Sequence, residues 1–236
     1  TDVWVPSSNN IKPQIGDQVA LGYYQNLKKN AYRISTEIYY KTLQNQIDYR
    51  NGANILLNDQ VEGELVYGKG RAFGLELLLE KKKGKFTGWI SYTLSRSLRQ
   101  FDDINDGIEF SARQDRIHDV SVVLMYKLTP SLALAGTFVY YTGDAVTFPS
   151  GKYEIGGNVI PLYTERNGYR MPDYHRADLG LTWYLKDKKR FEHNLNFSIY
   201  NVYARQNAFT ISFEENSETG ETEAIQTSLF KMVPSI

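Results

Sequence analysis

Two histidines of this chain stand beside acidic residues, in a pattern that could polarise water or a hydroxyl group. His118 lies in the segment RQDRIHD and His175 in PDYHRAD, each with an aspartate within three positions. An Asp–His pair is an arrangement that general acid–base catalysis uses. Neither segment places a serine beside its base as a nucleophile. We therefore interpret both clusters as ion pairs where a loop enters a strand, and we predict no catalytic residue.

Metal, phosphate and nucleic-acid sites are not indicated either. The acidic stretch FDDINDGIEF has the composition of a calcium loop, but it lacks the spacing of the twelve-residue motif. The chain has no cysteine, which excludes thiolate ligands, and no helix follows its glycines to make a phosphate cradle. Lys plus Arg and Asp plus Glu both total 27, so a basic excess is missing. We expect no metal, no cofactor and no nucleic-acid partner.

A long segment between Tyr141 and Ala177 carries the residue types that dominate recognition sites. We consider six of its side chains as candidates for contacting a substrate, and packing of the loop on itself is the alternative for the same residues. The six candidates are Tyr153, Tyr163, Arg166, Tyr169, Arg170 and Tyr174.

The elements that flank this segment read as β-strands with one apolar and one polar face. In the stretch 32–41, tyrosine, isoleucine and threonine alternate with charged or polar residues. The same period of two predicts strands at 18–26, 65–80, 86–95, 120–127, 132–140, 177–184, 195–199, 208–213 and 224–230. The polar face is predicted to carry Arg33, Glu37, Glu76, Thr87, Ser91, Thr93, Asp119, Asp178, Asn194 and Asn196.

The connections between these strands alternate in length. Short turns at 28–30, 81–84, 128–130 and 186–190 alternate along the chain with long polar loops at 44–63, 96–115 and 141–177. Short turns at one rim and long loops at the other are typical of outer-membrane barrels, whereas a soluble sandwich has loops at both ends. We predict an all-β, antiparallel transmembrane barrel of roughly ten strands. Because the first residues read as a loop and the last as the start of a strand, we expect part of a larger barrel.

Several segments together resemble the TonB-dependent outer-membrane receptors, in particular those of Bacteroidetes. They include GRAFGLELLLEKKKGKFTGWISYTLSRS, RQDRIHD, YYTGDAVTFPSGKY, NGYRMPDYHRADLGLTW and NFSIYNVYARQNAF. The most specific piece is Arg-x-Pro-x-Tyr-x-Arg-x-Asp-Leu, which runs from Arg170 to Leu179. The resemblance covers nearly the whole chain and implies that residues 1–236 are the C-terminal part of a plugged barrel of about 22 strands.

This resemblance implies a receptor in the cell outer membrane that takes up a scarce nutrient with energy from TonB. The implied partners are outer-membrane lipid and lipopolysaccharide, the TonB complex through an N-terminal part, a surface lipoprotein, and an extracellular small-molecule, glycan or peptide substrate. The plug and the energy-coupling box match nothing in this chain, and its ending, VPSI, lacks the terminal aromatic of the family. The alternative is a self-contained smaller barrel that acts as a pore, an adhesin or a hydrolase at the rim. A soluble β-sandwich is the third possibility.

Overall fold

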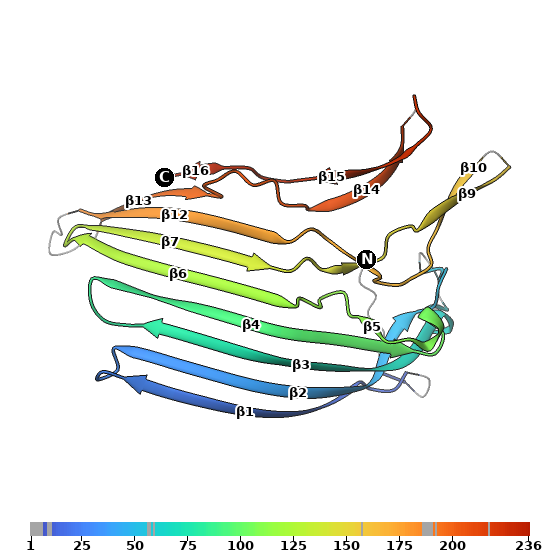
Figure 1. Cartoon of the computed structure of the whole chain (residues 1–236), viewed down its shortest axis with the longest axis horizontal. Coiled ribbons are helices and arrows are strands. Elements are labelled where there is room, and N and C mark those ends of the chain that lie inside the picture. Colours follow the sequence, from blue (N-terminus) through green and yellow to red (C-terminus); the bar gives the residue numbers. More distant parts are fainter. Residues whose placement is uncertain are drawn as a thin grey trace.

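The computed structural model of the chain is dominated by one large antiparallel sheet (Figure 1). It describes residues 7–8, 11–55, 58, 60–156, 158–185, 191, 193–216 and 218–236. The order across the sheet is β1-β2-β3-β4-β6-β7-β12-β13-β16, and the short β5 pairs with β4. The bounds are β1 Ile15–Leu27, β2 Tyr32–Tyr49, β3 Leu65–Lys81, β4 Phe86–Phe101, β5 Phe110–Ser111, β6 His118–Thr129, β7 Leu132–Tyr141, β12 Tyr174–Tyr184, β13 Asn194–Tyr200 and β16 Val233–Ser235.

The sheet is open, because β1 and β16 form its two edges and do not pair with each other. All neighbours along the path are antiparallel, and each main strand is followed in space by the next strand in sequence. This up-and-down order is that of a barrel wall. The observed architecture confirms the prediction of an all-β, antiparallel membrane-type barrel and is that of a partial barrel.

One face of the sheet is apolar and bare. Direct pairing places Leu21, Ile38, Leu75 and Leu94 in one row across four strands. No element among the described residues covers this row, and Leu21 is 71% exposed. A soluble protein would bury such a surface, whereas a barrel presents it to lipid.

The opposite face is polar, as the alternation predicts. Glu37, Glu76, Thr93 and Asp119 stand directly opposite one another across β2, β3, β4 and β6. The two glutamates are neighbours of like charge, an arrangement that costs stability unless a cation lies near. All ten residues expected on the polar face share this side, because residues of one parity along each strand pair only with one another.

The chain has almost no hydrophobic core. Among the described residues, Val66, Phe101, Ile104 and Phe110 form a small buried cluster near the ends of β3 and β4. A β-sandwich packs one face of each sheet against the other. Neither face of this sheet is covered by another sheet among the described residues, so the sandwich interpretation is wrong.

Two strands run further than the sequence pattern predicts. Strand β2 continues to Tyr49 through a shift of register between Leu43 and Gln46, at a bulge where Asn45 has a φ of 54°. A bulge moves the alternation by one residue, so the period of two stops although the strand does not. Strand β4 continues to Phe101 with polar side chains on both faces, which period-two analysis reads as a loop.

The predicted last strand pair does not join the main sheet. Strands β14 (Thr210–Glu215) and β15 (Thr222–Thr227) pair with each other in a separate hairpin. The chain returns through β16, which pairs with β13. The reason is topological: the segment after β13 turns away at Asn201, whose backbone N–H donates to Asp178. The hairpin is therefore part of a fourth long connection.

The short connections gather at the rim opposite the long ones (Figure 1). Residues Lys28, Lys29 and Asn30 form a tight turn, all three with positive φ. The predicted turn at 186–190 lies outside the described residues. Within the described part of the chain, the structure contains no helix with the length and apolarity that a membrane span requires.

Candidate functional site

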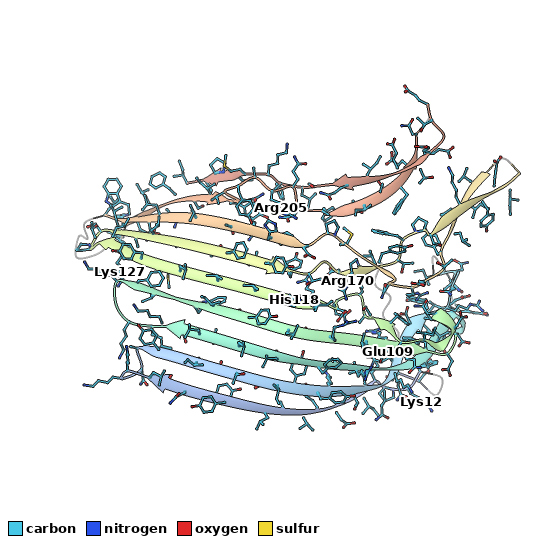
Figure 2. The ribbon with its side chains drawn as sticks, viewed as in Figure 1. Lys12, Glu109, His118, Lys127, Arg170 and Arg205 are labelled. Atoms are coloured by element: carbon cyan, nitrogen blue, oxygen red, sulfur yellow. The ribbon has the colours of Figure 1, made fainter. Side chains whose placement is uncertain are left out.

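Four long connections lie at one rim and make up the candidate site. We name them loop 1 (50–64), loop 2 (102–117), loop 3 (142–173) and loop 4 (201–232). Loop 1 holds the short helix η1 (Val61–Glu64) and loop 2 holds η2 (Asn105–Gly107). Loop 3 contains two small antiparallel strand pairs, β8 (Ala145–Val146) with β11 (Tyr169–Arg170), and β9 (Gly151–Ile155) with β10 (Asn158–Leu162). Figure 2 shows Arg170 and Glu109 at this rim and Lys127 at the other.

Arg166 ties loop 3 to the top of β2 and to loops 1 and 2. Its Nη1 donates to Asp48 Oδ1 at 2.6 Å and to the Tyr49 carbonyl at 3.0 Å, and its Nη2 donates to Asn51 Oδ1 at 2.9 Å. Its backbone N–H and C=O pair with the amide side chain of Asn105 at 2.8 and 3.0 Å. The guanidinium of this predicted substrate contact is therefore already occupied by protein acceptors, and it sets the position of loop 3.

Arg170 binds a buried carboxylate in loop 2. Asp115 has an exposed fraction of only 1%, and its Oδ2 accepts from Arg170 Nη2. The Ser97 backbone N–H donates to its Oδ1 at 2.6 Å. Arg96 Nε lies 3.3 Å from Oδ2 but makes no hydrogen bond, so that contact is electrostatic. The segment RQDRIHD is thus fixed to loop 3 by a charge pair, as expected of a rim contact and not of a catalytic one.

Cations and aromatic rings form a row across β7, β12 and β13, at the strand ends next to the long loops. The Arg116 guanidinium lies 3.8 Å from the Tyr141 ring, and that ring stacks on Tyr174 at 4.6 Å with an interplanar angle of 3°. Arg176 continues the row, because its Nη1 donates to the Tyr174 hydroxyl and its guanidinium lies 4.1 Å from the Tyr200 ring. Such stacking fixes the planes of the rings.

The six predicted substrate contacts do not converge on one point. Tyr153 is on β9, Tyr163 follows β10 and Tyr169 is on β11, and all three are exposed. Tyr163 and Arg166 line a common cavity of about 330 Å³. Tyr174 is part of the stacked row, and Arg170 holds loop 2.

Neither histidine cluster has the geometry of an acid–base pair. His118 Nδ1 lies 2.9 Å from the Tyr92 hydroxyl, and His175 Nδ1 lies 2.9 Å from the Tyr203 hydroxyl. These tyrosines, not the neighbouring aspartates, are the partners of the rings. Within the residues the structure describes, no group of three His, Cys, Asp or Glu side chains could hold a metal ion.

The acidic stretches are engaged with the protein or exposed. Glu109 forms a bidentate contact with Arg71 at 2.8 and 2.7 Å, which joins loop 2 to β3. The acidic tip of loop 4, with Glu214, Glu215, Glu218, Glu221 and Glu223, surrounds the β14–β15 turn. Its contacts with loop 3 include two made by Lys152, whose Nζ donates to the Gly220 carbonyl at 3.1 Å and lies 3.8 Å from the Glu215 carboxylate.

Sequence reasoning missed a cleft between loops 3 and 4. Phe148 in loop 3 lies 5.1 Å from Phe213 in loop 4, edge to face. Two cavities of about 450 and 280 Å³ adjoin there, and Phe209 lines both. The signal that could have found them is the phenylalanines inside the polar stretches AVTFPS and QNAFTISF, because apolar rings in loops need a partner.

The matching family model decides the family. The model described as "TonB dependent receptor-like, beta-barrel" matches residues 2–202. The chain belongs to the TonB-dependent receptor family. A comparison with curated protein sequences found no match.

Solved structures of TonB-dependent receptors share the fold. One is the ferric-catecholate import receptor Fiu of Escherichia coli K12 in its closed form, at 15% identity and a TM-score of 0.57, covering 98% of this chain and 29% of that one. A second is the ferripyoverdine receptor of Pseudomonas aeruginosa, at 14% identity and a TM-score of 0.61, covering 85% of this chain and 25% of that one. A third is the FrpB iron transporter of Neisseria meningitidis, at 16% identity and a TM-score of 0.56, covering 96% of this chain and 31% of that one.

The chain therefore spans between a quarter and a third of the length of these TonB-dependent receptors. At these identities the likeness shows the fold alone. The family and these relatives are receptors and transporters, not enzymes, which agrees with the absence of a predicted catalytic residue.

Proposed function

We propose that this chain is the C-terminal part of the barrel of an outer-membrane receptor that imports a scarce nutrient with energy from TonB. The observation that carries the proposal is the open sheet with one bare apolar face and one polar face, in a chain that matches the family model. In lipid, an open edge leaves backbone groups without hydrogen bonds, so further strands must complete the wall.

The role proposed for each part of this chain follows from the two faces of the sheet and from the rim that carries the long loops. The apolar face contacts lipid, the polar face lines the lumen, and the crown of four loops meets the substrate. Lipopolysaccharide contacts the outer rim, and a plug and TonB act through an N-terminal part of the protein. The proposal retains the Bacteroidetes type and a surface lipoprotein partner, on the strength of the sequence motifs alone.

The six candidate residues take two roles in this proposal. Tyr153, Tyr163 and Tyr169 are exposed on loop 3 and can contact the substrate directly. Arg166, Arg170 and Tyr174 act by holding the loops in place, because their polar groups bind other loops or neighbouring side chains.

Two experiments test the proposal. The open reading frame must continue for several hundred residues upstream and encode a plug, and a length near that of this chain would refute it. A deletion strain grown on single defined nutrients should fail on one of them and recover when the gene is restored. Binding of that nutrient by the purified receptor completes the test, and unchanged growth on every nutrient would count against uptake.

The self-contained smaller barrel gains no support from the structure. Such a barrel needs its first and last strands paired, whereas β1 and β16 lie at opposite edges of the sheet.

A further inference from the structure

The cleft between loops 3 and 4 has the size and the walls of a ligand site. Its larger cavity, about 450 Å³, lies between Arg113, Phe148 and the start of β14. Its smaller cavity, about 280 Å³, lies over Tyr141, Tyr174 and Tyr200. Asp144 and Phe209 line both cavities, so the two cavities adjoin. Small-molecule sites occupy about 300–1,000 Å³ and combine apolar walls with few polar groups.

The rings of the cleft are held in fixed orientations and are open to a ligand. The stacked pair Tyr141 and Tyr174 forms one side, and its planes are set by Arg116. Phe209 lines both cavities and is 64% exposed although it is a large apolar residue. A flat apolar group between such rings gains contact area at little cost in side-chain entropy.

Most polar groups of the cleft already have protein partners. Asp144 Oδ1 accepts from Arg116 Nε at 2.9 Å. Thr147 Oγ1 accepts from the Asn167 backbone N–H at 3.0 Å, and Asn167 Nδ2 donates to the Ser111 carbonyl at 2.9 Å. A ligand with many hydroxyl groups, such as a saccharide, would find few free donors and acceptors here.

Of the two charged side chains that line the cleft, Arg113 and Asp144, Arg113 is the unpaired one, and it gives the cleft its charge. Its side chain is exposed and makes no hydrogen bond or ion pair within the described part of the chain. Because Asp144 is neutralised by Arg116, the guanidinium of Arg113 leaves an unpaired positive charge at the cleft. The nearest glutamate of the acidic tip of loop 4, Glu214, is three residues from Ile211, about 10 Å of extended chain, and does not line either cavity. A guanidinium binds carboxylates and phosphates through charge-assisted, bidentate hydrogen bonds.

We propose that this cleft binds a small organic anion that carries an apolar or aromatic ring, with Arg113 holding the acidic group and Phe209 and the Tyr141–Tyr174 pair holding the ring. The inference rests on the proposed function, since a nutrient receptor must hold its cargo at the extracellular loops. It deepens that function by naming a site and a substrate class, and it sets neutral saccharides aside.

Binding of naphthoate to the intact receptor in lipid nanodiscs tests the site, measured by titration calorimetry against empty nanodiscs. Naphthamide, which is neutral and of nearly the same shape, is the matched ligand, and maltotriose is the saccharide. Naphthoate should bind more tightly than naphthamide, and maltotriose should not bind. Arg113→Gln should lower the affinity for naphthoate by at least about tenfold, the loss expected for one charged hydrogen-bonded contact. It should leave the affinity for naphthamide unchanged.

Two further variants complete the design. Arg113→Lys keeps the charge and should retain part of the naphthoate affinity. Phe209→Ala should lower the affinity for naphthoate and for naphthamide to the same extent. Arg99→Gln is the control, because the Arg99 side chain also makes no hydrogen bond or ion pair with another described side chain and lines a different cavity, beside Ile11 and Leu65. Equal affinity for the acid and the amide, or equal effects of Arg113→Gln and Arg99→Gln, would overturn the proposal.

Failure of the site and failure of the proposed function give different results. If the deletion strain shows a nutrient defect but Arg113→Gln leaves naphthoate binding intact, the uptake proposal stands and the site is wrong. If naphthoate binding depends on Arg113 but no nutrient defect exists, the site stands and the uptake proposal is wrong.

Discussion

Asp115 is buried, and its carboxyl group is surrounded by two arginines and a backbone N–H. Arg170→Ala removes one of these cations and leaves the carboxylate with Arg96. Breaking a buried ion pair costs about 3–5 kcal/mol. Since Arg96 remains, we expect a loss on the order of 2 kcal/mol in the local stability of loops 2 and 3. Hydrogen exchange of residues 111–117 and 143–146, followed by mass spectrometry, should show the lost protection.

The control for this prediction is Arg50→Ala. Arg50 also makes a bidentate contact, with Glu64 at 2.6 and 2.8 Å, but its side chain is exposed. Exposed ion pairs contribute little to stability because water screens them. If each variant lost the same amount of hydrogen-exchange protection around its own broken ion pair, the burial of Asp115 would have no energetic consequence.

Asp173 gives a pH dependence at the end of loop 3. The Tyr140 hydroxyl donates to its carboxylate at 2.7 Å and the Gly143 N–H donates at 3.2 Å, and these bonds lower the pKa of Asp173 below its ordinary value. A carboxyl with a lowered folded-state pKa stabilises the fold above its unfolded pKa of about 3.9 and loses that contribution as the pH falls through the folded value. The junction of loop 3 and β12 should therefore loosen below about pH 4.

Carbon-13 NMR of the Asp173 carboxyl group measures this shift directly. The wild-type group should titrate below the ordinary range for aspartate, and Tyr140→Phe should move the midpoint upward. A midpoint that Tyr140→Phe leaves unchanged would contradict the assignment of the hydroxyl as the main cause.

At the scale of elements, the base of loop 3 depends on a glycine. A Cβ atom on Gly143 would lie 1.8 Å from the Met171 carbonyl oxygen, where the two ends of loop 3 pass each other. Gly143→Ala must push these backbones apart, which weakens the Met171 N–H bond to the Asp144 carbonyl. We expect a cost above about 1 kcal/mol and faster proteolysis within loop 3. Gly63→Ala is the control, because nothing lies within 4 Å of its Cβ position.

The sequence predicts the strands well wherever one face meets lipid and the other meets water. Ile34 and Ile38 alternate with Arg33, Ser35 and Glu37, and that alternation identifies both the strand and its orientation. It fails where both sides are wet, as in the upper half of β4, and where the Asn45 bulge interrupts it. The limits of β2 and β4 therefore depend on pairing with distant strands, which a local pattern does not contain.

The candidate site was less accessible to sequence reasoning for a related reason. The third loop was correctly identified as long and rich in Tyr and Arg, but nothing local shows that Arg166 binds Asp48, which is 118 positions away. Phe209 belongs to a predicted strand whose place in the fold was wrong, since its hairpin is part of loop 4. Contacts between loops are long-range, so they become visible only once the sheet has set the positions of the loop ends.

At the scale of the whole molecule, the two faces of one strand should respond oppositely to the same charge. Leu77 and Leu78 are neighbours on β3, but Leu77 pairs with Tyr92 on the apolar face and Leu78 with Ser91 on the polar face. Leu77→Arg should destabilise the barrel by about 2–4 kcal/mol, the cost of a cation near the middle of the bilayer. Leu78→Arg should cost much less, because its side chain faces water.

Denaturant unfolding of the receptor in lipid vesicles measures both variants. The pair is matched in residue type, strand and depth, so the difference between them reports only the face. Similar losses in the two variants would mean that the apolar face does not meet lipid.

The unequal length of the strands affects how the receptor can deform. Strand β2 has 18 residues and β7 has 10, a difference of about 26 Å of extended chain. The wall at β2–β4 is therefore held close to its rim by long backbone ladders, with one bulge in β2, whereas the wall at β7–β12 ends early and continues as loops joined by side-chain contacts and a few backbone bonds. Side-chain contacts break one at a time and a strand ladder does not, so the mouth is stiff on one side and compliant on the other. Under the proposed uptake function, cargo that enters the mouth would bend the side of loops 3 and 4, where the cleft lies.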